Sequence, residues 1–222
     1  MSFGKISLSA ALIAATFGIT SCGSLNEQSP AAGISRMVKA RIAARSETPA
    51  PAAPVLTRQA ADASPGAFIL LSRAGTTSQA SMVVAGVNGN KVTWMSADQV
   101  SITLDNGLLV ATRGFVQDLM ASDNTQVINA LVASGGTANR TIEYLDGLDQ
   151  ISPELLQCRI ASGGIENIET LGKIVKTERF DEDCTSQKMR FTNIYWINDD
   201  GAIVKSRQLV SPGVGYVELI RP

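Results

Sequence analysis

The sequence contains no histidine among its 222 residues. Histidine is the commonest general base at neutral pH and the commonest zinc ligand, so its absence excludes a Ser-His-Asp triad and any metal site that needs imidazole. The chain also lacks a Gly-x-Ser-x-Gly motif, a phosphate-binding glycine loop and a calcium-loop spacing. We therefore expect a protein without enzymatic activity, with no metal and no dissociable cofactor.

Paired carboxylates leave one catalytic alternative open, because glycosidases need two acids and no histidine. No feature of the sequence singles out such a pair. The candidates for a carboxylate-based glycan hydrolase or lyase are Glu143, Asp146, Glu166 and Glu169.

The chain has no excess of positive charge, with 19 Lys and Arg against 20 Asp and Glu. Nucleic-acid-binding proteins need a basic surface to neutralise phosphates, so we expect no nucleic-acid partner. Hydrophobic residues make up 45% of the chain, which is normal for a globular domain. No segment after the first apolar run is long and apolar enough to predict a membrane-spanning helix.

That first run, residues 6–19, reads ISLSAALIAATFGI and follows a start whose one charge is Lys5. It is shorter than the roughly 20 residues of a spanning helix, and it is typical of a secretory signal peptide. Residues 19–22, ITSC, resemble the bacterial lipobox, although Ile19 stands where Leu is commoner. The resemblance implies cleavage before Cys22, a diacylglycerol on its thiol and an acyl chain on its new amino group. The alternative is an ordinary signal peptide with a chance cysteine.

The residues after Cys22 predict the destination of the lipoprotein. They are Gly23 and Ser24 rather than the Asp that often marks retention at the inner membrane. Two acyl chains already anchor a protein stably, since each buried methylene contributes about 0.8 kcal/mol. We therefore expect a lipid-anchored protein on the periplasmic face of the outer membrane.

The cysteine count supports an oxidising compartment. The chain has three cysteines, and using Cys22 for lipid leaves Cys158 and Cys184. In an extracytoplasmic protein these two predict a disulfide, the alternative being two free buried thiols.

Three regions follow from composition. Residues 1–21 form the predicted signal peptide, residues 22–56 a lipidated tether, and residues 57–222 a single β-rich domain. Within the tether, residues 34–45 (ISRMVKARIAAR) have apolar positions at helical spacing. They predict a short amphipathic helix that rests on anionic lipid, packs on the domain or simply continues the tether. Residues 46–54 (SETPAPAAP) form a Pro/Ala-rich spacer.

The domain reads as β-strands joined by tight turns. Asn88-Gly89, Asn106-Gly107 and Asp200-Gly201 each separate two strand-like runs, and such dipeptides favour two-residue hairpins because both positions tolerate positive φ. The expected pairs across the second turn are Leu104 with Leu109 and Ile102 with Ala111. Across the third turn they are Ile197 with Val204, Phe191 with Val210, Trp196 with Lys205 and Ile194 with Arg207.

The remaining segments complete the predicted fold. Residues 140–146, 156–162, 165–180 and 215–221 alternate as strands. Asp123-Asn124 predicts the start of a helix with an apolar stripe of Val127, Ile128, Leu131 and Val132, ending at Gly135-Gly136. The fold class is mainly antiparallel β, a meander curled into an open barrel or a twisted sheet, with one or two short helices.

Several phrases occur together in one order. They are Trp94-Met95-Ser96-Ala97-Asp98, Asn106-Gly107-Leu108, Ala111-Thr112-Arg113-Gly114, Asp118-Leu119, Arg140 with Tyr144, the two late cysteines, Asn193-Ile194-Tyr195-Trp196, Ser206-Arg207-Gln208, Ser211-Pro212 and Gly215-Tyr216. Over residues 55–222 this order resembles the group 4 capsule polysaccharide lipoprotein family, also called YjbF-like. The resemblance implies an outer-membrane lipoprotein encoded among genes for exopolysaccharide or capsule production, without an established enzymatic activity.

Two non-enzymatic functions fit these features. The first is an accessory factor for polysaccharide production or export, whose partners are export proteins or the polysaccharide itself. Its candidate binding surface comprises Trp94, Arg113, Asp118, Arg140, Tyr144, Tyr195, Trp196, Arg207, Gln208 and Tyr216, because aromatic rings stack on sugars while Arg and Gln bind hydroxyls or carboxylates. The alternative is a carrier of acyl chains or lipoproteins, with a barrel cavity lined by Ile102, Leu104, Leu109, Ile197 and Val204.

Overall fold

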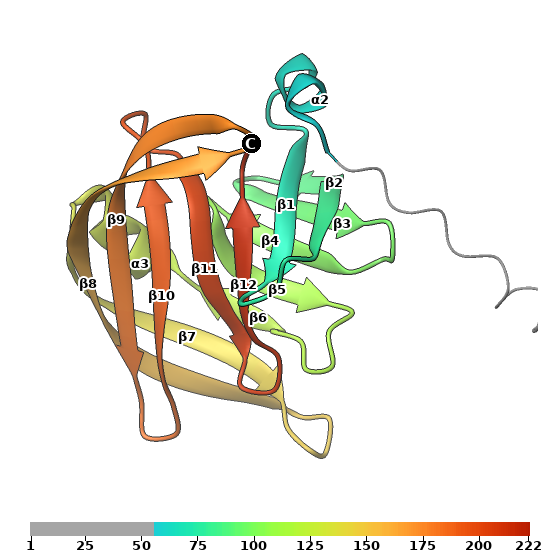
Figure 1. Cartoon of the computed structure of the whole chain (residues 1–222). Helices are drawn as coiled ribbons and strands as arrows, with labels where there is room; N and C mark the ends of the chain where they lie inside the picture. Colours follow the sequence, from blue (N-terminus) through green and yellow to red (C-terminus); the bar gives the residue numbers. More distant parts are fainter. Residues whose placement is uncertain (1–55) are drawn as a thin grey trace, which may run out of the picture. The chain divides into compact units, whose positions relative to one another are not determined.

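The computed structural model describes residues 56–222, which form one sheet of 12 strands with two short helices (Figure 1). Every strand pair is antiparallel. The predicted fold class is therefore confirmed. The predicted signal peptide, Cys22 and residues 34–45 lie outside the described residues. No helix among the described residues has the length and apolarity needed to cross a membrane.

The elements follow one another in a simple order. They are α2 (Arg58–Ala63), β1 (Phe68–Arg73), β2 (Gln79–Asn88), β3 (Lys91–Ser96), β4 (Ser101–Asp105), β5 (Leu108–Arg113), β6 (Ala121–Asp123), α3 (Thr125–Val132), β7 (Gly136–Leu145), β8 (Ile151–Thr170), β9 (Lys173–Thr185), β10 (Arg190–Ile197), β11 (Ile203–Ser211) and β12 (Gly215–Ile220).

Two meanders meet at the middle of this sheet. The strand order is β5-β4-β3-β2-β1-β12-β11-β10-β9-β8-β7-β6, so β1 to β5 and β6 to β12 each run in sequence order and join where β1 pairs with β12. The edge strands β5 and β6 are close to each other. The backbone N–H of Thr112 in β5 donates at 2.9 Å to the carbonyl of Leu119, which lies two residues before β6. The sheet is therefore a nearly closed barrel.

The turn between β4 and β5 follows the prediction closely. Asn106 and Gly107 both have positive φ, 49° and 89°, as a type I′ hairpin requires. Gly107 is also needed for space, because a Cβ there would lie 3.0 Å from Ile203 Cδ1. Leu104 pairs with Leu109 as expected. A register shift after Thr103 makes Ile102 pair with Thr112, so its predicted pairing with Ala111 is wrong.

The other two hairpins are shifted slightly from the prediction. Asn88 pairs with Lys91, so the first turn is centred on Gly89 and Asn90 rather than on Asn88 and Gly89. In the third hairpin the expected pairs of Trp196 with Lys205 and of Ile194 with Arg207 are confirmed. A register shift after Trp196 then places Ile197 opposite Ile203 rather than Val204.

The helix α3 packs on β7 and β8. Val127 and Leu131 are buried as predicted, whereas Val132 is 82% exposed and Ala130 takes the buried position instead. The Asp123 carboxylate accepts from the Thr125 backbone N–H at 3.0 Å and holds the first turn. The shorter helix α2 was not predicted, and the Thr57 hydroxyl caps it by accepting from the Ala60 N–H.

Residues 165–180 are not one strand, contrary to the prediction. The chain reverses at Leu171 and Gly172, both with positive φ, between β8 and β9. This hairpin is long, and in Figure 1 its tip arches over the end of the barrel where the C-terminus lies. Arg58 of α2 donates to the carbonyls of Thr170 and Leu171 at this tip.

The interior of the barrel is packed with side chains. Ile102, Leu104 and Leu109 are 0–5% exposed and belong to the main apolar cluster. Ile197 is half-buried against the same cluster, and Val204 is 7% exposed. The first three residues therefore form core rather than the wall of an open internal cavity.

Candidate functional site

The ten residues of the predicted binding surface do not share one exposed face. Five of them are buried, with exposed fractions of 4% for Trp94, 2% for Arg140, 0% for Tyr195, 8% for Trp196 and 0% for Gln208. Arg113 is exposed, and Asp118, Tyr144, Arg207 and Tyr216 are half-buried. Placing the five buried residues on a surface was therefore wrong.

A buried ion pair explains the position of two of these residues. Arg140 of β7 directs Nη1 at both carboxylate oxygens of Glu182 on β9, each at 3.0 Å. The Tyr195 hydroxyl donates to the same carboxylate at 2.6 Å, and the Asn193 amide donates to it at 2.8 Å. Because Glu182 is 0% exposed, these three donors replace the water that its charge would otherwise bind.

The charges of this cluster reinforce one another. Burial alone would lower the pKa of Arg140, but the charges and hydrogen bonds of Glu182 and Tyr195 together outweigh it, so the pKa of Arg140 is raised. Burial, followed by the charge of Glu182, raises the pKa of Tyr195 well above its usual value. At neutral pH the cluster therefore contains a charged guanidinium and a neutral phenol.

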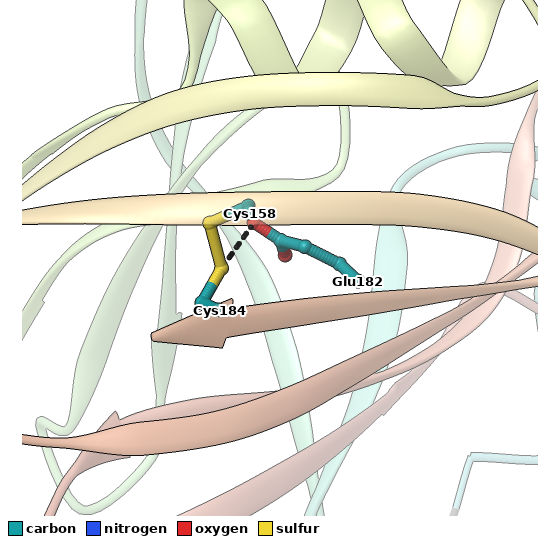
Figure 2. A group of neighbouring side chains, drawn as sticks. All are labelled: Cys158, Glu182 and Cys184. Atoms are coloured by element: carbon teal, nitrogen blue, oxygen red, sulfur yellow. Dashed lines mark hydrogen bonds between the residues drawn. A yellow bond between two sulfur atoms is a disulfide. The ribbon is translucent and has the colours of Figure 1, made fainter. Parts of the chain in front are cut away.

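The predicted disulfide lies beside this cluster (Figure 2). Cys158 of β8 and Cys184 of β9 are directly paired in the sheet, and their sulfur atoms are 1.98 Å apart. The Glu182 Oε1 atom is 3.3 Å from Cys184 Sγ. A disulfide sulfur carries no proton, so this approach is a contact rather than a hydrogen bond. The two cysteines and Glu182 are close enough to ligate a metal ion, but the disulfide uses both sulfurs and leaves no thiolate.

Gln208 closes the barrel seam where strand pairing stops. Its side chain reaches from β11 to β5, accepting from the Leu109 N–H at 2.7 Å and donating to the Gly107 carbonyl at 2.9 Å. From the other side, the Asn124 amide donates to the Leu109 carbonyl at 3.0 Å. These side-chain amides act as the missing neighbouring strand for β5.

Three more predicted residues also satisfy backbone groups. Asp118 accepts from the Thr112 hydroxyl at 2.7 Å and from the Gly114 N–H at 3.0 Å. Arg113 donates to the Leu119 carbonyl at 3.2 Å. The Tyr144 hydroxyl donates to the Val210 carbonyl at 3.0 Å, and burial raises the pKa of Tyr144 to about 12.

The remaining predicted aromatics make paired contacts on the outer side of the sheet. Trp196 donates to the Glu166 carboxylate at 2.6 Å, and the Lys205 ammonium is 5.1 Å from the centre of the indole ring. The Arg207 guanidinium is 3.9 Å from the ring centre of Tyr216. Such cation–aromatic pairs fix side chains in place.

Two of the carboxylates considered for catalysis, Glu166 and Asp146, do not have the character of a general acid. The hydrogen bond from Trp196 lowers the pKa of Glu166, and the backbone N–H of Gln150 lowers the pKa of Asp146. A glycosidase acid needs a raised pKa instead. Glu143 is half-buried on β7, and Glu169 is exposed on β8.

Glu182 and Asn193 were missed as members of the central cluster. The available signal was the alternation of β9, where Phe180, Glu182 and Cys184 share one face. Because Cys184 was already assigned to a buried disulfide, Glu182 two residues earlier had to point inward as well.

Two surface hollows are candidates for ligand binding. The outer groove, of about 500 Å³, is lined mainly by apolar residues including Leu56, Phe68, Val83, Val84 and Met95. The second hollow, here called the trough, surrounds the turn between β10 and β11. It consists of adjoining pockets of about 590, 270 and 430 Å³.

Shared wall residues show that the three pockets of the trough adjoin one another. Asn106, Gly201 and Ile203 line both the first and the second pocket. Ala202 and Arg221 line both the second and the third. The trough is therefore elongated and has both polar and apolar walls.

Comparison with known proteins places the chain in context. A family model described as "Group 4 capsule polysaccharide lipoprotein gfcB, YjbF" matches residues 34–221. The crystal structure of the hypothetical lipoprotein YmcC from Escherichia coli (K12) is similar, with a TM-score of 0.64 and 22% sequence identity, over 73% of this chain and 86% of that one. This likeness shows a shared fold. None of the curated proteins matches the sequence.

Proposed function

Because this chain belongs to the group 4 capsule polysaccharide lipoprotein family, we propose that it is a non-enzymatic accessory factor for the production or export of a capsule or exopolysaccharide. It acts from the periplasmic face of the outer membrane, held there by lipid on Cys22. Its partners are export proteins or the polysaccharide itself. The observation that carries this proposal is the family match over residues 34–221.

Two features of the chain support the anchored location. Residues 19–22 have the lipobox order, and Gly23 follows the cysteine rather than a retention Asp. The disulfide between Cys158 and Cys184 suits an oxidising compartment such as the periplasm.

The geometry supports binding or assembly rather than catalysis. The acids and cations inside the barrel are paired with one another, as Arg140 and Glu182 are, and are closed off from solvent. A catalytic group must reach its substrate, so this cluster is suited to holding the barrel together.

Deleting the gene tests the proposal. The deletion strain should secrete less surface polysaccharide, and a plasmid carrying the wild-type gene should restore it. Unchanged surface polysaccharide in the deletion strain would contradict the proposed role. The anchor is tested separately by the intact mass of the native protein, which should correspond to residues 22–222 with three acyl chains.

The outer groove favours a second candidate, binding of acyl chains. Its walls are apolar and its volume of about 500 Å³ is within the usual range of ligand pockets, roughly 300–1,000 Å³. The carrier hypothesis therefore moves from the packed interior to this groove. Lipid extracted from the purified protein should appear in about equimolar amount, and its absence would remove this candidate.

A further inference from the structure

The middle pocket of the trough is formed by segments far apart in the sequence. Asn90 lies in the turn between β2 and β3, and Asn106 lies in the turn between β4 and β5. Trp94 comes from β3, and Arg221 follows β12 at the end of the chain. The fold thus gathers two amides, an indole and a guanidinium around a hollow of about 270 Å³.

Three of the four side-chain donors of this pocket have no partner in the described part of the chain, whereas the fourth, the Asn106 amide, donates to the Asp105 carboxylate at 3.0 Å. The Trp94 side chain is 4% exposed, and its indole N–H has no partner among residues 56–222. An indole N–H can only donate, and a buried donor without an acceptor is costly and uncommon. The Arg221 guanidinium and the Asn90 amide also make no hydrogen bond or ion pair with side chains in this range.

The neighbouring pockets add apolar contacts and more polar groups. The first pocket contains Val132 and Ile165, which are 82% and 63% exposed, together with half-buried Ile197 and Ile203. The third pocket is lined by Lys173, Lys176 and Asp200, and by Asp199, which pairs with Lys176 at 3.8 Å. Apolar surface beside amides and charged groups of both signs matches the chemistry of a sugar chain, which presents C–H faces between its oxygen atoms.

We propose that the trough binds a segment of a linear polysaccharide. Hydroxyl or carboxylate oxygens of the sugars accept from Arg221, Asn90 and Trp94, and C–H faces pack on the isoleucine side chains. Three adjoining pockets suit several consecutive sugar units rather than a single monosaccharide. This inference rests on the proposed role in polysaccharide production or export and assigns the contact with the polymer to this site.

The state of Trp94 has a measurable consequence. Its indole nitrogen is covered by neighbouring atoms in the unliganded protein. Trp94 lines the middle pocket, so a sugar bound there changes the surroundings of this ring. The chain has two tryptophans, and Trp196 is already hydrogen-bonded to Glu166 outside the trough. A fluorescence change on binding should therefore come from Trp94.

The binding experiment uses the mature chain, residues 22–222, with Cys22→Ser in place of the lipid. The probes are oligosaccharides released from the polysaccharide of the producing strain, a galacturonate hexamer and a maltohexaose. Fluorescence titration and calorimetry measure the affinity of each probe. Arg221→Ala should weaken binding by about tenfold and Asn90→Ala by about threefold, because a hydrogen bond from a charged donor contributes more to affinity than one from a neutral donor. Trp94→Phe should abolish the fluorescence change, because it removes the indole that reports binding.

Arg73→Ala provides a matched control. Arg73 is exposed and pairs with Val217 on β12, whereas Arg221 follows the opposite end of that strand. The Arg73→Ala substitution therefore removes a charge of the same kind far from the trough and should leave binding unchanged. Arg221 is also exposed, so its replacement should not unfold the domain, which the melting temperature checks.

The outcomes separate this inference from the proposed function. Binding of the native oligosaccharides or of the acidic hexamer, weakened by Arg221→Ala but not by Arg73→Ala, supports the trough. Binding of none of the three probes, or equal weakening by both substitutions, overturns it. In that case a polysaccharide defect in the deletion strain would still support the proposed function, which would then act through protein partners.

Discussion

The buried pair of Arg140 and Glu182 gives the sharpest test of how the barrel is held together. Arg140→Met removes the cation but leaves the Glu182 carboxylate with 0% exposure and only the Tyr195 and Asn193 donors. Breaking a buried pair in this way costs about 3–5 kcal/mol, because one charge stays buried without its counterion. A domain has roughly 5–15 kcal/mol of stability in total, so the loss should be large.

Urea unfolding of the mature chain at pH 7, under oxidising conditions, measures this loss. Adding Glu182→Gln to Arg140→Met removes the second charge but keeps an acceptor for Tyr195 and Asn193. The double variant should therefore be more stable than Arg140→Met alone, by about 2 kcal/mol. Arg179→Met is the control, since the ion pair of Arg179 with Asp181 is about one-third exposed and should contribute less than about 1 kcal/mol. A loss below about 1 kcal/mol for Arg140→Met, or no recovery in the double variant, would refute the reasoning.

Three further predictions follow from the seam, a tyrosine and the disulfide. Gln208→Leu leaves the buried Leu109 N–H without an acceptor, so unfolding free energy should fall by about 1–3 kcal/mol and amide exchange at Leu109 should quicken; unchanged exchange would contradict the seam role. The pKa of Tyr144 is about 12 in the folded protein and about 10 in the unfolded chain. The contribution of Tyr144 to the free energy of unfolding is therefore fully present below pH 10, and about 2–3 kcal/mol is lost as the pH rises toward 12. Tyr144→Phe should flatten that decline in urea titrations, and an equally steep decline would exclude Tyr144 as its source. Replacing both Cys158 and Cys184 by Ser should cost roughly 3–4 kcal/mol for a separation of 26 residues, and a cost near zero would contradict the chain-entropy account.

The turns could be predicted because their signals are local. Asn106-Gly107 adopts the two positive φ angles that its dipeptide favours, and the neighbouring pair Leu104 and Leu109 follows directly. The register further along the strands could not be predicted in the same way. The shifts after Thr103 and after Trp196 depend on packing across the barrel, which no nearby residue announces.

Burial of polar side chains was the main source of error at the candidate site. Arg140, Tyr195 and Gln208 have the chemistry of sugar-binding residues, yet each satisfies a partner inside the fold. Those partners lie between 13 and 99 residues away in sequence, so no local pattern reveals them. Trp196 is covered because the hairpin of β8 and β9 brings Glu166 over it, which is likewise a long-range contact.

The residues in the phrases that indicated the family therefore mainly hold the barrel together, and few of them are available to contact a polysaccharide. Gln208 closes the seam. The Asn193 side chain donates to the Glu182 carboxylate and accepts from the Leu209 N–H of β11. Trp94 differs from these residues, because its indole N–H has no partner in the described range. It joins a hollow made of turns, and only the folded chain brings those turns together.

The most direct test of the central claim, an anchored protein that serves polysaccharide production or export, compares two chains in the deletion strain. One is wild type, and the other carries Cys22→Ser together with a cleavable signal peptide that releases it into the periplasm. Surface polysaccharide is measured at equal amounts of folded, disulfide-bonded protein. The account predicts that the wild-type chain restores the polysaccharide and the unanchored chain does not. Equal restoration by both chains would contradict it.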